Sequence, residues 1–178
     1  MRESQTMNTW SEDTYGEPCR ECGFSFGISM QAAISTVMAS PERYGQLLAG
    51  STGSEHHPDL SWSVSGYVCH VADNTRIWAE RYLGAAEGPR EIATYDENLL
   101  ATARSYDKIP LAGALWSLKK AVVDWREALE HAERASVVLL HPERGELSVL
   151  DAVRSNTHDV VHHAWDIQRS LEFPPAVA

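Results

Sequence analysis

The stretch LAGALWSLKKAVVDWREAL, residues 111–129, carries the most regular pattern in this sequence of 178 residues. Its apolar residues recur at alternating steps of four and three, which places them on one face of an α-helix. Pro110 precedes the stretch, and proline is favoured in the first turn of a helix. The spacing therefore predicts a long amphipathic helix. The apolar stripe consists of Leu111, Leu115, Leu118, Val122, Trp125 and Leu129.

Two earlier segments show the same type of spacing. Residues 29–50 form the first, and Pro41 within it predicts a kink or a restart of the helix. Residues 61–83 form the second, with an apolar stripe that we expect Gly84 to end. Each segment is long enough to cover one side of a hydrophobic core.

A fourth helix is predicted over residues 148–171, where Ser148 and Asp151 have the spacing of a capping box. The connection at 84–109 leaves room for a short helical piece. The stretch SVVLLHPERGEL, residues 136–147, has the composition of a strand, but a lone strand has no obvious partner here. We therefore interpret it as a connector.

These segments predict an all-α protein, a four-helix bundle domain over residues 28–173. Residues 1–27 are polar and have no sustained period, so we expect an N-terminal arm that carries a Cys-x2-Cys knuckle. Residues 174–178 begin with two prolines and are expected to form a C-terminal tail.

Composition and charge exclude several classes of function. Hydrophobic residues make up 43% of the chain and charged residues 22%, which is typical of a globular protein. The net charge is −10 and Lys and Arg do not cluster, so we expect no nucleic-acid partner and no anionic membrane surface. Three cysteines are too few for a disulfide framework, and no secretory signal is evident. These features predict a cytoplasmic protein.

The stretch THDVVHHAWDIQ, residues 157–168, places His158 and His162 four residues apart. Two imidazoles at this spacing are neighbours on a helix and can bind one metal ion. A third ligand must come from a facing helix, and His70 in the middle of residues 61–83 is suited to that position. Both histidines of the pair lie off the apolar stripe, so ordinary half-exposed histidines are an equal alternative.

Two segments resemble helices of the DinB-like four-helix-bundle superfamily. They are DLSWSVSGYVCHVADNTRIWAERYL, residues 59–83, and HPERGELSVLDAVRSNTHDVVHHAWDIQ, residues 141–168. In that superfamily the first helix carries one metal-binding histidine and the second carries two, four residues apart. The resemblance implies a metal triad of His70, His158 and His162, with His163 outside it.

The superfamily includes thiol S-transferases and mycothiol-dependent maleylpyruvate isomerases. In the isomerases one of the two ligands on the last helix is typically Glu, so His at both positions favours the transferase branch. Three imidazoles would leave open positions on a divalent ion, which is the arrangement of a catalytic site. The resemblance thus implies a transferase that joins a small thiol, such as mycothiol, to a small electrophile. Metal-assisted hydrolysis and a non-catalytic, stress-related bundle are the alternatives.

Imidazole ligands suit zinc, with nickel or iron as alternatives. Residues that flank the expected triad on the same helical faces are predicted to line a substrate pocket. Asp73 and Asp166 lie one turn from expected ligands, where each would either orient an imidazole or belong to a solvated face. A homodimer through Trp-rich faces is a further prediction. The predicted wall residues are Tyr67, Asn74 and Trp165.

The motif PCRECGF contains Cys19 and Cys22 and has the form of half a zinc ribbon. Three interpretations of the pair are open. It binds a second, structural zinc ion with help from a histidine such as His56 or His57. It forms a reversible disulfide, as Cys-x2-Cys motifs do in redox proteins. Or it is a structural turn. Of these three interpretations, we prefer the structural zinc ion.

Overall fold

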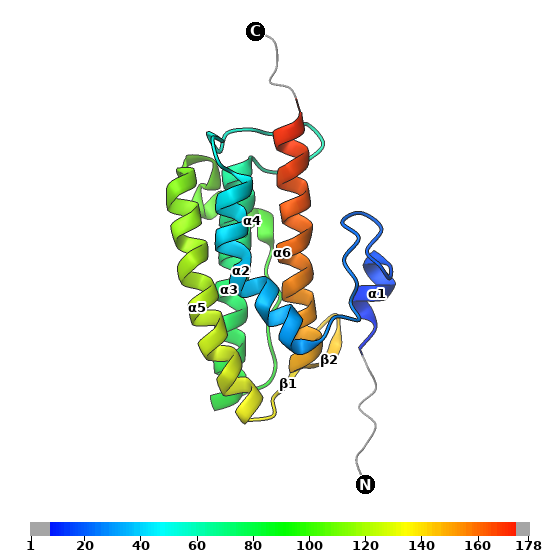
Figure 1. Cartoon of the computed structure of the whole chain (residues 1–178). Helices are drawn as coiled ribbons and strands as arrows, with labels where there is room; N and C mark the ends of the chain where they lie inside the picture. Colours follow the sequence, from blue (N-terminus) through cyan, green and yellow to red (C-terminus); the bar gives the residue numbers. More distant parts are fainter. Residues whose placement is uncertain (1–7, 174–178) are drawn as a thin grey trace.

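The computed structural model describes residues 8–173 of the chain. Four long helices run side by side and form a bundle (Figure 1). The predicted all-α four-helix bundle is confirmed, and a small hairpin is added to it. Within the described residues, no helix is both long enough and apolar enough to cross a membrane. The four helices are α2 (Met30–Leu47), α3 (Val64–Glu87), α5 (Leu111–Arg134) and α6 (Val149–Glu172).

The core lies where the predicted stripes meet. Leu118, Trp125 and Leu129 of α5 are fully buried, as the 4-3-4 spacing predicts.

α2 continues as one helix through Pro41, and Figure 1 shows that it changes direction along its length. α6 begins at the predicted capping box, since the Ser148 side chain accepts from Asp151 N and the Asp151 carboxylate accepts from Ser148 N.

Two local predictions were wrong. α3 continues past Gly84 to Glu87, because its last turn buries Ala85 in the core, and this burial outweighs the low helix propensity of glycine. Residues 138–148 form an antiparallel hairpin of strands β1 (Val138–His141) and β2 (Gly145–Ser148). β1 pairs with β2, the segment that follows it directly in the chain. Gly145 follows the turn with a positive φ of 72°, which glycine adopts without strain.

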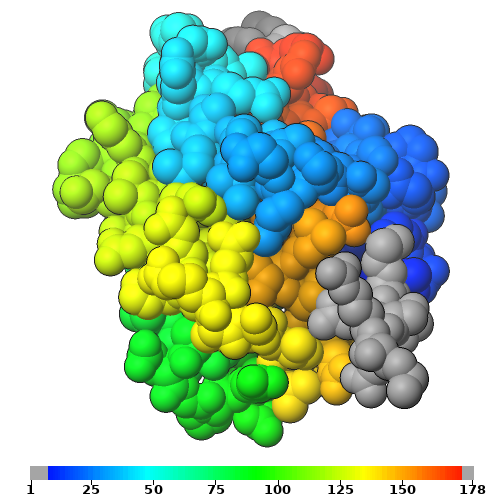
Figure 2. Space-filling view, turned by 60° about the horizontal axis from the view of Figure 1, so that its bottom comes forward, coloured from blue at the N-terminus to red at the C-terminus, as the bar shows by residue number. Residues whose placement is uncertain are grey.

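The N-terminal arm packs against the bundle. A short helix, α1 (Trp10–Tyr15), is followed by a loop, and both lie beside α6 (Figures 1 and 2). Asn8 Nδ2 donates to two carbonyls of the hairpin, and Arg154 Nε of α6 donates to Ile28 O. The arm is thus connected to the bundle at both of its ends. Residues 1–7 of the predicted arm and the predicted tail at 174–178 lie outside the described residues.

A buried carboxylate connects α3 to the segment that follows it. Asp73 is 2% exposed and accepts hydrogen bonds from Arg104, at the end of α4 (Glu97–Arg104), and from Tyr106 OH at 2.7 Å, in the 3-10 turn η1 (Tyr106–Lys108). Asp73 was expected either to orient an imidazole or to belong to a solvated face. It has neither role, because it is buried and its hydrogen bonds come from α4 and η1.

We expect Asp73→Ala to lower the free energy of unfolding by about 2–4 kcal/mol, because it leaves the buried Tyr106 hydroxyl without its acceptor and removes the partner of Arg104. Urea titration followed by circular dichroism measures the loss. Glu80→Ala on the same helix is the control, since its exposed pair with Arg76 is worth less than about 0.5 kcal/mol. Equal effects of the two substitutions would contradict the prediction.

Candidate metal centre

Four polar residues of α6 form two overlapping pairs at helical spacing. Asp159 and His163 are four residues apart, and so are His158 and His162. Each pair lies on one face of the helix. Because successive residues of an α-helix are rotated by about 100°, the two pairs face different directions although they are adjacent in sequence.

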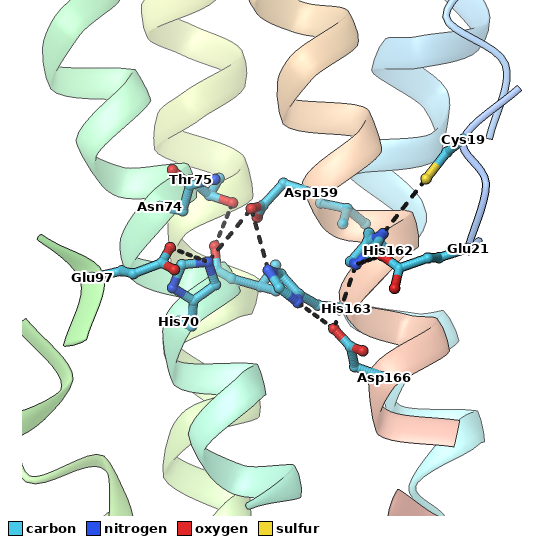
Figure 3. A network of polar contacts seen from close by, with 12 residues as sticks. Cys19, Glu21, His70, Asn74, Thr75, Glu97, Asp159, His162, His163 and Asp166 are labelled. Carbon is cyan, nitrogen blue, oxygen red and sulfur yellow. Dashed lines mark hydrogen bonds and ion pairs between the residues drawn. The ribbon is translucent and has the colours of Figure 1, made fainter. Parts of the chain in front are cut away.

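The first pair faces α3. His70 Nε2 lies 3.5 Å from Asp159 Oδ1, and His163 Nε2 lies 3.5 Å from the same oxygen. In Figure 3 these three side chains converge between the two helices. One ligand atom from each residue lies within 4.8 Å of the other two, which is close enough for all three to hold one ion. We call this set the interhelix group.

Charge and hydrogen bonding link the members of this group around a protonated His163, which a metal ion would have to deprotonate on binding. Burial alone would raise the pKa of Asp159, but the imidazoles of His163 and His70 beside it hold that pKa well below its usual value. For His163, burial disfavours the charged form, but Asp159 and Asp166 outweigh burial and raise the pKa to about 9. The carboxylate at the centre of the group is therefore ionised near neutral pH.

Asp166 orients the His163 ring. His163 Nδ1 lies 2.9 Å from Asp166 Oδ2, and an ionised carboxylate only accepts hydrogen bonds. Nδ1 is therefore the donor, and Nε2 is directed towards Asp159. Carboxylates orient metal-binding histidines in this way. Of the two earlier alternatives for Asp166, the orienting role holds, but its partner at hydrogen-bond distance is His163.

His70 has an unsatisfied nitrogen that fits a metal ligand. The residue is 2% exposed, and its Nε2 makes no hydrogen bond to any residue between 8 and 173. The ring stacks on Trp62 at a centroid distance of 4.9 Å, which fixes its plane. Glu97 Oε2 lies 3.9 Å from the same nitrogen. With Asp159 Oδ1 at 3.5 Å and Glu97 Oε2 at 3.9 Å, the nitrogen has only distant acceptors, and a cation bound between it and these oxygens would satisfy it.

The second pair faces the arm. His158 and His162 lie beside Cys19 and Cys22, and one ligand atom from each of the four lies within 4.8 Å of the others. Cys19 Sγ is 3.9 Å from His162 Nδ1, a contact that Figure 3 draws on the side of α6 away from His70. We call this set the arm group. His56 and His57, the expected helpers of the cysteines, lie elsewhere, in contact with Leu60 and Phe173.

The imidazoles of the arm group are held in the neutral form that binds metal. Burial, reinforced by the neighbouring His162, lowers the pKa of His158 to about 4. Burial also lowers the pKa of His162, with His163 contributing. Burial raises the pKa of the Cys22 thiol to about 11, while the Phe24 backbone opposes the rise. A thiol in this position becomes a thiolate when a metal ion binds it.

The structure thus divides the residues of the predicted triad between two groups. The triad of His70, His158 and His162 stays a prediction: His158 and His162 lie with the two cysteines and His70 lies with Asp159 and His163, while all three histidines line the same cavity. The pair at a spacing of four that faces His70 lies on the expected helix, but it starts one residue later, at Asp159. Asp159 was missed, and its only signal was its own spacing of four from His163. The preference for the transferase branch depended on histidine at both positions, whereas the pair that faces His70 has Asp159 at one of them.

A cavity of about 310 Å³ opens beside the interhelix group. Asn74 lines it as predicted, and Tyr95 OH donates to Asn74 Oδ1 at 2.9 Å. Tyr67 and Trp165 do not line it. Tyr67 is buried against Trp62 and His163, and Trp165 lines a separate pocket between α2 and α6, because its face of α6 is turned towards α2.

Two cationic side chains face the cavity opposite the acidic ones. Arg81 and Arg144 both line it, and Arg144 Nε is buried without a hydrogen-bond partner in the described part of the chain. Arg144 stacks over Trp10 at 4.1 Å, and Tyr15 of the arm also lines the cavity. The arm therefore forms part of the wall.

Fold and site together define a four-helix-bundle protein with candidate metal ligands on facing helices. Among solved structures, the chain matches one described as "YfiT from Bacillus subtilis is a probable metal-dependent hydrolase with an unusual four-helix bundle topology". The match has a TM-score of 0.66 at 18% sequence identity and covers 83% of this chain and 91% of YfiT. The four-helix-bundle fold expected from the sequence is thereby confirmed. No protein-family model matches the sequence, and neither does any curated protein.

Proposed function

We propose that this protein is a metal-dependent hydrolase of a small substrate, with a divalent ion held by His70, Asp159 and His163. One observation carries the proposal: two imidazoles and one carboxylate from two facing helices converge beside a cavity large enough for a small molecule. A set of three protein ligands is typical of catalytic zinc sites, in which a position stays open. The description of YfiT as a probable metal-dependent hydrolase supports the same class of reaction.

When bound, such an ion supplies Lewis acidity and makes water a nucleophile near neutral pH. The chain supplies the remaining functions. Asp166 accepts from His163 Nδ1 and so fixes the orientation of that ring, and Trp62 fixes the plane of His70. Glu97 lines the cavity close to His70, half-exposed, where its carboxylate can accept the proton that water loses on attack.

The substrate class follows from the cavity wall. Arg81 and Arg144 both line the cavity, and their positive charges favour a substrate with an anionic group. The donor set suits zinc first, and iron or manganese also accept two histidines and a carboxylate. A homodimer stays a prediction.

The transferase predicted from the sequence is the second candidate function. A small thiol such as mycothiol would occupy the same open position, and the electrophile would occupy the cavity. No contact within residues 8–173 favours a thiol over water, so hydrolysis is preferred. The two reactions differ in one property that is simple to measure, which is dependence on added thiol.

The test uses full-length protein loaded with zinc, manganese or iron and offered a panel of small carboxylate and phosphate esters and amides, with and without thiols. We expect metal-dependent hydrolysis without thiol, and its loss in His70→Ala together with one bound ion. His57→Ala is the matched control, since His57 lies against Phe173 outside the cavity. Turnover that requires a thiol would favour the transferase. No turnover under any condition would favour a non-catalytic bundle.

A further inference from the structure

The geometry points to a structural zinc site formed by Cys19, Cys22, His158 and His162, which fastens the arm to α6. This site is separate from the interhelix group and does not depend on the proposed reaction. Two cysteines and two histidines are a donor set typical of structural zinc, with four protein ligands and no open position. The four ligand atoms already lie within 4.8 Å of one another.

The arm is folded to present its two sulfur atoms. Gly23 N donates to Cys19 O at 3.0 Å, and Cys19 N donates to Phe24 O at 2.8 Å, which closes a tight turn around the pair. Gly23 has a φ of 73°, a conformation that glycine adopts without strain. The Glu17 carboxylate accepts from Phe26 N at 2.7 Å and so fixes the return of the loop.

The bundle presents the two imidazoles with one buried nitrogen unsatisfied. His158 is 6% exposed, and its Nε2 has no hydrogen-bond partner in the part of the chain that is described. Three aromatic rings enclose it, at centroid distances of 4.5 Å from Tyr15, 5.6 Å from Phe24 and 4.9 Å from Phe26. The two phenylalanine rings offer that nitrogen no polar atom and Tyr15 makes no hydrogen bond to it, whereas a cation bound at its lone pair would satisfy it.

A zinc ion explains why so small an element is ordered. In the described part of the arm, residues 8–27, the fully buried core consists of Cys19, Phe24 and Phe26, with a few half-buried side chains packed against it. Such a core is too small to hold a loop by itself, and small folds use a metal or disulfides in its place. A reversible disulfide is the competing interpretation of the cysteines, but it would leave the convergence of two histidines on the same point unexplained. Fastening the arm also places Tyr15 at the cavity wall.

The test exploits neighbouring residues that belong to different groups. Protein purified under reducing conditions is analysed for metal by elemental analysis. We expect about two ions per chain in the wild type, and about one each in Cys22→Ser, His162→Ala and His163→Ala. After cobalt substitution, thiolate charge-transfer absorption should persist in His163→Ala and disappear in Cys22→Ser.

A second measurement needs no variant and tests the fastening directly. Arg20 lies exposed within the knuckle, so chelation in the wild type should speed tryptic cleavage there by at least about tenfold. Cleavage at Arg90, which is exposed in the loop after α3, should not change and is the control. Metal content in Cys22→Ser and His162→Ala equal to that of the wild type would overturn the proposal. A disulfide between the two cysteines in freshly reduced protein, or chelation without effect at Arg20, would overturn it as well.

Discussion

Replacing His163 with alanine is expected to weaken metal binding at the interhelix group by more than about 100-fold and to remove metal-dependent activity. The reason is that His163 supplies one of only three ligand atoms there, and Asp159 and His70 cannot hold the ion with comparable affinity alone. Loss of a residue that merely orients a ligand costs about 10–100-fold in metal affinity, so loss of the ligand itself should cost more.

Asp166→Asn provides the graded comparison. Asparagine keeps the size of the side chain but removes the charge that orients His163 Nδ1, so we expect a loss of about 10–100-fold. Competition with a chelator of known affinity measures both variants. If Asp166→Asn were as damaging as His163→Ala, Asp166 would be a ligand. If both bound metal like the wild type, the interhelix group would not be a metal site.

Asn156→Leu is expected to lower the free energy of unfolding by about 2–5 kcal/mol. Asn156 Oδ1 accepts hydrogen bonds of 2.9 Å from Tyr82 OH of α3 and from Trp125 Nε1 of α5, all within the core. Leucine is similar in size but leaves both donors buried and unpaired, at about 1–3 kcal/mol each. Chemical denaturation of the two proteins measures the difference.

Thr157→Val is the control for this substitution. Thr157 is equally buried, but its hydroxyl donates at 2.8 Å to Val153 O, a carbonyl that also accepts a backbone bond within the helix. Its removal leaves no donor or acceptor unpaired, so the loss should stay below about 1 kcal/mol. Similar losses for both variants would show that helix packing, and not the paired donors, sets the stability at this level of α6.

The Asn156 junction also bears on the site. Asn156 lies three residues before Asp159, on the same side of α6, and its two partners fix how α6 is rotated against α3 and α5. That rotation is what turns Asp159 and His163 towards His70. We therefore expect Asn156→Leu to weaken metal binding at the interhelix group as well.

The local elements of this protein could be predicted because their signals are local. The α5 stripe, the capping box at Ser148 and Asp151 and the helical spacing of α3 all depend on residues within a few positions of one another. The hairpin at 138–148 was missed for the opposite reason: its composition was recognised, but the pairing of the strand with its own continuation was not considered.

The amino-acid sequence by itself determined that the chain is a helical bundle, that α3 and α6 carry the polar residues of the site, and that a cysteine pair precedes the bundle. The tertiary structure alone decided which of these residues belong together. In the sequence, adjacent residues such as His162 and His163 are equally good candidate ligands. Because successive residues of a helix point about 100° apart, the two side chains meet different partners. The rotation of α6 against its neighbours is set by distant contacts, among them the donors to Asn156 and the arm packed on α6.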